Sequence, residues 1–157
     1  MRDAGPAADN EENEYVRVSE YMTRKVLTAA PDDGVRETFF RMREARIRHL
    51  PVLDGAQLVG MLSDRDLRRP DWVDEAPDLS HDYQLDDSLS VSDLMSHNPI
   101  AVHTYDDLSK ACALINTHGF GALPVLDKGD HLVGIVTKAD LVRAFGQVLE
   151  AHHEHIG

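Results

Sequence analysis

The chain contains an internal repeat. Three blocks recur in the same order: VSEYMT at 18–23 and VSDLMS at 91–96, LPVLD at 50–54 and 123–127, and LVGMLS at 58–63 and LVGIVT at 132–137. An Asp-Leu pair follows each third block, and the two copies are offset by about 73 residues. Blocks that recur in one order predict a supersecondary unit built twice, with stacked copies sharing a core.

Each copy has the pattern of a β-α-β-β-α unit. A first strand is predicted at 26–28 and at 100–102, from short apolar runs. A helix should follow, because apolar residues recur at helical spacing, namely Val35, Phe39 and Met42, and in the second copy Leu108, Cys112 and Ile115. Two further strands are predicted on either side of a turn, at 50–53 and 57–62 and at 123–126 and 131–136. A last helix should start at Ser63 and at Thr137, which gives an α/β (α+β) fold.

The repeat also sets the predicted boundaries. They are a flexible acidic leader at 1–14, the first repeat at 15–69, a linker at 70–90, the second repeat at 91–147 and a flexible tail at 148–157. One unit alone has too little core, so we expect the two to pack into one body with an approximate twofold axis. The linker exceeds a usual connection, and we expect a short helix near 83–89 and docking of Trp72.

Composition excludes several classes of protein. The net charge of -12 argues against nucleic acid and against an anionic membrane surface, because both require clustered cations. No apolar run approaches the roughly 20 residues that span a bilayer. The single cysteine, Cys112, cannot form an internal disulfide, so a cytoplasmic, reducing setting fits best. Its apolar neighbours predict that this thiol packs in a buried helix face.

These residues resemble the CBS domain family, arranged as a tandem pair called a Bateman module. The resemblance rests on Val-Ser-x-x-Met at each start, Leu-Pro-Val-Leu-Asp before each turn, and Gly-x-x-Ser/Thr-x-x-Asp at each end. It covers residues 18–68 and 91–144, and identifies the chain as similar to stand-alone CBS domain-containing proteins. The resemblance implies a regulatory module that binds adenosine-containing ligands in clefts between paired units, and that often dimerises.

The Gly-x-x-Ser/Thr-x-x-Asp motif carries the first candidate binding residues. By the resemblance, Ser63 and Thr137 contact phosphate, and Asp66 and Asp140 accept hydrogen bonds from ribose hydroxyls. A helix N-terminus is in itself suited to an anion. The same spacing is also close to a capping box, which a helix needs without any ligand. Both interpretations stay open, and one hydroxyl can serve both.

The segment before the second strand carries the other candidates. The resemblance implies that Ile47 and Phe120 pack on the base and that Arg48 and His49 meet phosphate. The second copy has Gly121 and Ala122 at the basic positions, so the two clefts should differ, and a phosphate-rich ligand should prefer the one that Arg48 and His49 reach. The alternative is that both are solvated surface residues.

Two cations, Arg65 and Lys138, lie within the motifs and are further candidates, although exposed charges usually only solvate a surface. His152, His153 and His155 are predicted to be a solvated tail and not a metal site. His118 and His131 are predicted to be surface residues. The sequence has no P-loop, GxGxxG or nucleophile elbow and no carboxylate pair placed by a motif, so no catalytic residue is predicted.

The sequence therefore predicts a non-catalytic, ligand-sensing module. AMP, ADP or ATP would bind between the copies and shift a conformational equilibrium seen by a regulated enzyme or transporter. A homodimer is expected. The alternatives are a structural interaction module with empty clefts, or a module for another ligand such as S-adenosylmethionine, an NAD-type compound or a cyclic dinucleotide. An enzyme with unrecognised chemistry is the least favoured alternative.

Overall fold

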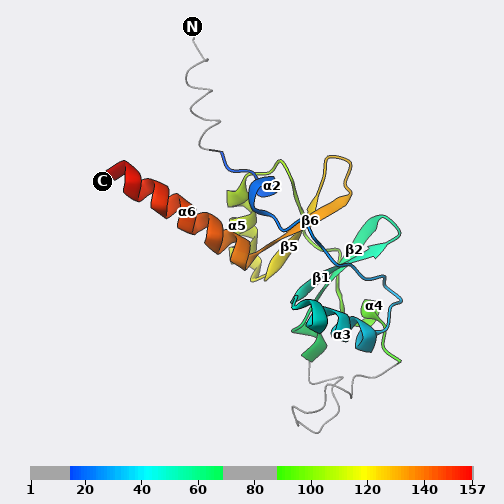
Figure 1. Cartoon of the computed structure of the whole chain (residues 1–157). Helices are drawn as coiled ribbons and strands as arrows, with labels where there is room; N and C mark the ends of the chain where they lie inside the picture. Colours follow the sequence, from blue (N-terminus) through cyan, green and yellow to red (C-terminus); the bar gives the residue numbers. More distant parts are fainter. Residues whose placement is uncertain (1–14, 69–87, 157) are drawn as a thin grey trace. The chain divides into compact units, whose positions relative to one another are not determined.

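A computed structural model describes residues 15–68 and 88–156 and divides into two compact units. Residues 25–100 form one unit, and the described residues before and after that range form the other (Figure 1). The predicted leader lies outside the described residues, as does Trp72. So does most of the predicted helix at 83–89, of which only Ser88 and Leu89 are described, and neither is helical.

The unit at 25–100 is a small antiparallel sheet covered by helices. Its elements in chain order are α3 (Val35–Ala45), β1 (His49–Asp54), β2 (Gln57–Ser63), the 3₁₀ helix η1 (Asp66–Arg68), α4 (Val91–Leu94) and β3 (Ser96–His97). The strand order is β1-β2-β3. Val35, Phe39 and Met42 face the core from α3, which confirms the predicted helical face. The predicted hairpin at Asp54-Gly55 is also confirmed, since β1 and β2 pair antiparallel across it.

Two elements of this first copy differ from the prediction in the described part of the chain. Residues 26–28 do not form the expected strand, and the next residue, Ala29, makes a single parallel bridge with Val52. The helix expected after Ser63 is, in the described part of the chain, the three-residue η1.

The second unit contains the complete β-α-β-β-α order. Its elements are α2 (Val18–Tyr21), β4 (Val102–His103), α5 (Leu108–His118), β5 (Ala122–Leu126), β6 (Leu132–Thr137) and α6 (Lys138–Ile156). β4 runs parallel to β5, and β5 pairs antiparallel with β6. The predicted α+β class is thus confirmed as two small sheets, each with its own core.

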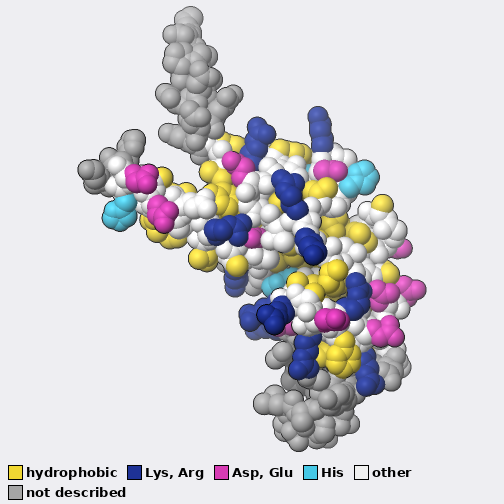
Figure 2. Space-filling view, in the orientation of Figure 1, with side chains coloured by type: hydrophobic (Ala, Val, Ile, Leu, Met, Phe, Trp, Pro, Cys, Tyr) yellow, Lys and Arg dark blue, Asp and Glu magenta, His cyan; other side chains and the backbone are white. Residues whose placement is uncertain are grey.

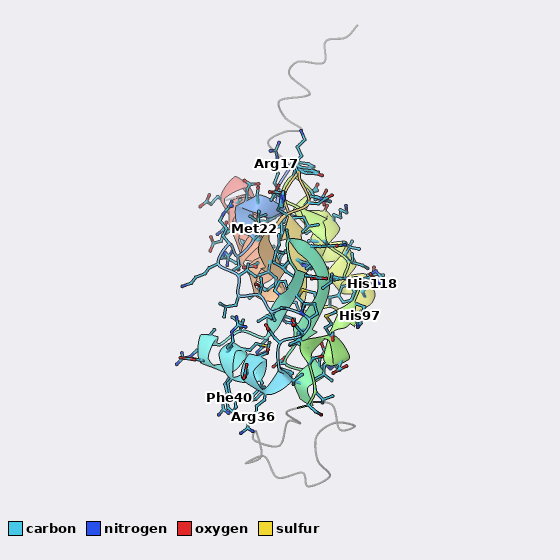
Figure 3. The ribbon with its side chains drawn as sticks, turned by 90° about the vertical axis from the view of Figure 1, so that its right-hand side faces the viewer. Arg17, Met22, Arg36, Phe40, His97 and His118 are labelled. Atoms are coloured by element: carbon cyan, nitrogen blue, oxygen red, sulfur yellow. The ribbon has the colours of Figure 1, made fainter. Side chains whose placement is uncertain are left out.

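Two short segments, here called arms, each belong to one repeat in the sequence but fold into the unit of the other repeat. The first arm, residues 15–24, begins the first repeat but folds into the unit of the second, where Val18 and Met22 join the core. Met22 is labelled in Figure 3. Its Thr23 exchanges backbone hydrogen bonds with Ile135 at 2.8 and 2.9 Å. The second arm, residues 88–100, folds in the same way into the unit at 25–100, where β3 pairs with β2. The spatial units therefore have different boundaries from the sequence repeats.

Glycine at the start of each Gly-x-x-Ser/Thr motif makes room for an arm. A Cβ at Gly134 would lie 2.9 Å from the carbonyl oxygen of Thr23, and one at Gly60 would lie 3.0 Å from that of Ser96. Both distances are shorter than ordinary van der Waals contact, and both neighbours are backbone atoms. In each unit, the glycine therefore allows the arm to pack closely against the strand that contains it, β2 or β6.

Two sequence predictions about helices are corrected. Cys112 is exposed, and the buried face of α5 consists of Leu108, Ala111 and Ile115. On the surface of α5, residues 111 and 112 lie on either side of the row formed by Leu108 and Ile115. Which of the two is buried depends on where the sheet packs against the helix. The predicted flexible tail is helical as far as Ile156, because no proline interrupts the helix formers that follow Gly146.

Candidate functional site

Strand pairing brings the two predicted motif segments of each unit together. His49 lies opposite Ser63 in the β1–β2 pair, and Ala122 lies opposite Thr137 in the β5–β6 pair. The amide of Asp64 donates to the carbonyl of Arg48 at 2.9 Å, and the amide of Lys138 donates to that of Gly121 at 3.2 Å. In each unit, the two motif segments therefore lie at the same end of the hairpin and together form one candidate site.

In the unit at 25–100, the site is built around a reciprocal pair of hydrogen bonds. The amide of Ser63 donates to Oδ2 of Asp66 at 3.0 Å, and the amide of Asp66 donates to Oγ of Ser63 at 3.1 Å. This is capping-box geometry at the start of η1. The Ser63 hydroxyl accepts one bond there and keeps its own proton to donate.

The second unit repeats this geometry with a more enclosed carboxylate. The amide of Thr137 donates to Asp140 at 2.9 Å, and the amide of Asp140 donates to the Thr137 hydroxyl at 3.2 Å. Asp140 is only 3% exposed. The hydroxyl of Thr23 donates to its carboxylate at 3.2 Å, and Nη1 of Arg143 lies 3.3 Å from Oδ1.

These contacts add two residues that the sequence analysis missed. Thr23 reaches Asp140 only because the first arm folds into this unit, which no local pattern indicates. Arg143 also donates to the carbonyl of Tyr21 at 2.9 Å and lies over the Tyr21 ring. The Asp140 carboxylate thus ties α6 to the first arm, and a ribose would reach it only by replacing an existing contact.

The remaining candidates differ in exposure. Arg48, Arg65 and Lys138 are exposed, Ala122 is buried, and the other residues of the two segments are of intermediate exposure. Ile47 and Phe120 pack partly against the core of their units, and the Phe120 ring stacks on His118 with centroids 5.0 Å apart. Exposed cations beside a hydroxyl are suited to an anionic group.

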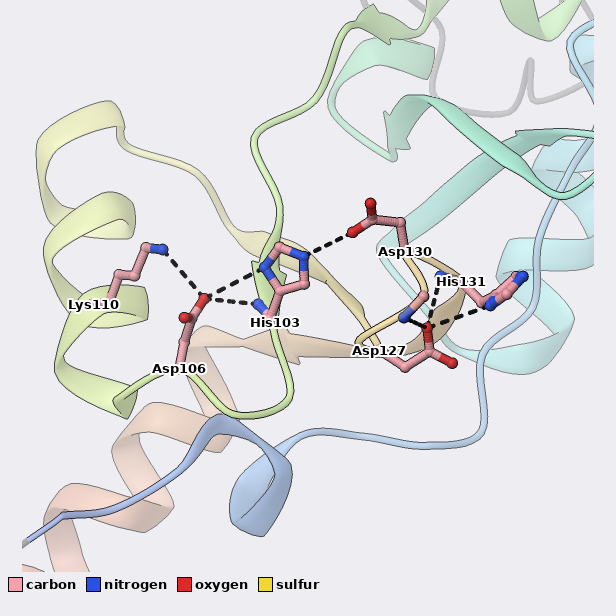
Figure 4. Close-up of polar contacts among 7 residues, drawn as sticks. His103, Asp106, Lys110, Asp127, Asp130 and His131 are labelled. Atoms are coloured by element: carbon pink, nitrogen blue, oxygen red, sulfur yellow. Dashed lines mark hydrogen bonds and ion pairs between the residues drawn. The ribbon is translucent and has the colours of Figure 1, made fainter.

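A separate cluster of charges joins β4 to α5 and to the β5–β6 turn. Nε2 of His103 lies 2.9 Å from Asp130, and the amide of His103 donates to Asp106 at 2.8 Å (Figure 4). Burial raises the pKa of Asp106, but the His103 amide and the Lys110 ammonium outweigh it and leave that pKa below its ordinary value. Hydrogen bonds from the backbone of His131 and Gly129 lower the pKa of Asp127 in the same turn.

Neither a metal site nor a membrane span is found in the part of the chain that the structure describes. No three His, Cys, Asp or Glu side chains there are grouped as a metal ion would require. No described helix combines the length and the apolar character needed to cross a bilayer.

Comparison with known proteins identifies the family. The family model of the CBS domain matches residues 18–70 and 91–147. The chain belongs to the CBS domain family. A CBS domain-containing protein of Dictyostelium discoideum is 31% identical over 137 residues, which cover 86% of this chain and 94% of the relative.

Solved structures of CBS pairs have the same fold. CBSX2 from Arabidopsis thaliana is 29% identical with a TM-score of 0.72, over 87% of this chain and 98% of that one. CBSX2 in complex with AMP is 31% identical with a TM-score of 0.68, over 84% and 97%. The CBS pair of protein MJ0100 has a TM-score of 0.69 at 22% identity, over 85% and 98%.

Other curated relatives are much longer than the matched region. The chain spans 23% of the inosine-5'-monophosphate dehydrogenase of Korarchaeum cryptofilum, to which it is 30% identical over 125 residues and 80% of its own length. CBS pairs therefore occur both in short proteins and as parts of larger enzymes.

Proposed function

We propose that this CBS pair is a non-catalytic regulatory module that binds an adenosyl ligand carrying phosphate, such as AMP, ADP or ATP. The observation that supports it most directly is the 31% identity to CBSX2, whose structure contains AMP. The likeness covers 84% of this chain, and the family model covers both copies of the motif.

The site geometry supports a phosphate group near the exposed cations. Ser63 and Thr137 each keep a hydroxyl proton to donate, because each already accepts from the amide three residues on. Arg65 lies two residues after Ser63, and Arg48 precedes His49, which pairs with Ser63 across the hairpin. The second unit offers Lys138 and has no counterpart of Arg48. The proposal therefore assigns the more phosphate-rich ligand to the motif in the unit at 25–100.

In this proposal, Asp66 and Asp140 have unequal roles. Asp140 is buried and holds the first arm, so its primary function is structural. Asp66 is of intermediate exposure and is the better candidate for a ribose hydroxyl. Ile47 and His49 would complete the base and phosphate contacts in this unit, and Phe120, Gly121 and Ala122 would line the weaker site.

Isothermal titration calorimetry with adenosine, AMP, ADP, ATP and S-adenosylmethionine tests the proposal. We expect AMP to bind more tightly than adenosine, because a charge-assisted contact to phosphate contributes about 1.5–3 kcal/mol. Arg48→Ala and Arg65→Ala should each weaken AMP binding about tenfold or more. Lys128→Ala, which removes an exposed cation from the β5–β6 turn, is the matched control and should leave the affinity unchanged.

An interaction module without a ligand is the second candidate. This candidate is favoured by the capping-box hydrogen bonds, in which the amides of Ser63 and Thr137 donate to Asp66 and Asp140 without any ligand. In that case no adenosyl compound produces heat or raises the melting temperature, which would refute the first proposal. Regulation of an enzyme or transporter, and a cytoplasmic location, remain predictions.

A further inference from the structure

Three polar side chains of α6 hold the first arm. Asp140, Arg143 and Gln147 follow one another at intervals of three and four residues, so they lie on one face of the helix. The Thr23 hydroxyl donates to Asp140 at 3.2 Å. Nη2 of Arg143 donates to the carbonyl of Tyr21 at 2.9 Å, and the Tyr21 hydroxyl donates to the side-chain oxygen of Gln147. These five residues, here called the clasp, join the arm to α6 in addition to its contacts in the core.

The clasp covers the Asp140 carboxylate. A carboxylate has about four lone-pair positions, and this one already accepts from the Thr137 amide and the Thr23 hydroxyl and pairs with Arg143. Asp140 is only 3% exposed. The Thr137 amide is fixed by the backbone at the start of α6. A ribose hydroxyl could therefore donate to Asp140 only by displacing Thr23 or Arg143.

Both competitors can leave Asp140 at a modest cost. The Arg143 side chain is 53% exposed, so water screens its pair with the carboxylate, and Figure 2 shows Lys and Arg side chains at the surface near the start of α6. Thr23 is exposed as well. A guanidinium that leaves Asp140 would keep its bond to the Tyr21 carbonyl and its position over the Tyr21 ring, 5.8 Å from the centroid. The clasp should therefore weaken ligand binding at this carboxylate without abolishing it.

The unit at 25–100 is built differently at the corresponding positions. In the repeat, Tyr21 corresponds to Leu94, which is only 8% exposed and lies in the core. A leucine offers neither a hydroxyl for a hydrogen bond nor an aromatic face to a guanidinium. Asp66 is of intermediate exposure, whereas its counterpart Asp140 is buried. The two candidate ribose-binding carboxylates therefore differ in access.

We propose that Thr23 and Arg143 determine the specificity of the second site, because they compete with the ligand for Asp140. This inference rests on the proposed function and adds the reason why one site is weaker. The chain should bind one nucleotide through the motif at Asp66, and a second one only by displacing the clasp. The competition acts on recognition of the ribose hydroxyls and not on the phosphate, so a ligand without those hydroxyls should be insensitive to it.

Calorimetric titration with AMP tests the competition in a chain whose first site has been disabled. In an Arg48→Ala, Asp66→Asn background, only the second site is left to titrate. Addition of Thr23→Val and Arg143→Met, here called the clasp variant, should lower the dissociation constant of AMP roughly fivefold to tenfold. The reason is that a hydrogen bond and an exposed ion pair no longer have to be broken at Asp140.

Three controls show whether the gain comes from Asp140. Arg24→Met removes an exposed arginine of the same arm, which donates to the carbonyl of Ser19 at 3.1 Å, and it should leave the dissociation constant unchanged. Thr23→Ser keeps the hydroxyl and should give no gain. The monophosphate of 2′,3′-dideoxyadenosine should bind the clasp variant no more tightly than the background chain, because it has no ribose hydroxyl to donate to Asp140.

The outcomes separate this inference from the proposed function. If AMP binds the unchanged chain but the clasp variant shows no gain at the second site, the competition is overturned and the proposed function stands. Two equal sites in the unchanged chain, or an equal gain with the dideoxy compound, would also overturn the competition. Failure of AMP to bind any of these chains would overturn both. If circular dichroism shows that the clasp variant is unfolded, Arg143→Met alone should still tighten AMP binding about twofold.

Discussion

Removal of the Asp140 carboxylate should destabilise the second unit by detaching α6 from the first arm. Asp140→Ala deletes the cap on the Thr137 amide, the acceptor for the Thr23 hydroxyl and the partner of Arg143. The cap contributes about 1 kcal/mol, the hydroxyl bond about 0.5–1 kcal/mol, and the Arg143 pair about 0.5 kcal/mol, because that side chain is 53% exposed. We therefore expect a loss of about 2–2.5 kcal/mol in the free energy of unfolding, before any penalty for buried donors left without a partner.

A double-mutant cycle isolates the contact between arm and helix. Thr23→Ala, Asp140→Ala and the double variant are compared by urea unfolding followed by circular dichroism. Because the Thr23 hydroxyl lies 3.2 Å from both carboxylate oxygens and shares its one proton between them, the two changes should be coupled by about 0.5–1 kcal/mol. Thr23→Ala with Asp66→Ala is the control, since Asp66 belongs to the other unit, and those effects should add. Coupling of Thr23 to Asp140 below about 0.3 kcal/mol would refute the role given to this bond.

Three further predictions follow from particular contacts. Gly134→Ala should cost about 1–3 kcal/mol in unfolding free energy, measured by urea unfolding, because its Cβ would press on the carbonyl of Thr23; Gly129→Ala, in the exposed turn, should cost less. The pKa of Asp106 is lowered in the folded chain, so this carboxylate contributes stability above its ordinary value of 3.8, and that stability is lost as the pH falls through the lowered pKa. Acid unfolding of Asp106→Asn should therefore show a shallower loss of stability below about pH 4 than the unchanged chain, and an equal slope would contradict the assignment. The exposed Cys112 thiol should react with a thiol reagent in the folded chain as completely as in urea, and Cys112→Ser should change stability by less than about 0.5 kcal/mol; a protected thiol would contradict the position of α5.

The sequence predicts what depends on local patterns. The hairpin between β1 and β2 follows from Asp54-Gly55, the buried face of α3 follows from the spacing of Val35, Phe39 and Met42, and the doubled hydroxyl-acid motif predicts the reciprocal capping bonds. In each case, the residues that determine the structure lie within a few positions of one another.

Features that depend on distant segments could not be predicted. The contact between Thr23 and Asp140 joins residues 117 positions apart, so nothing near either residue indicates it. The exposure of Cys112 depends on which side of α5 the sheet covers. The continuation of α6 beyond residue 147 is a different case, since its cause is local: helix formers follow Gly146, and this single glycine does not end the helix.

The crossed arms have a consequence for any attempt to separate or exchange the repeats. Each arm is covalently continuous with one repeat and folded into the other, so no single cut of the chain yields two complete halves. A fragment that ends at the repeat boundary near residue 90 keeps an arm that belongs elsewhere and lacks the one it needs. A chimera of two such proteins should therefore transplant residues 25–100 as a block, leaving both flanking segments with their native host.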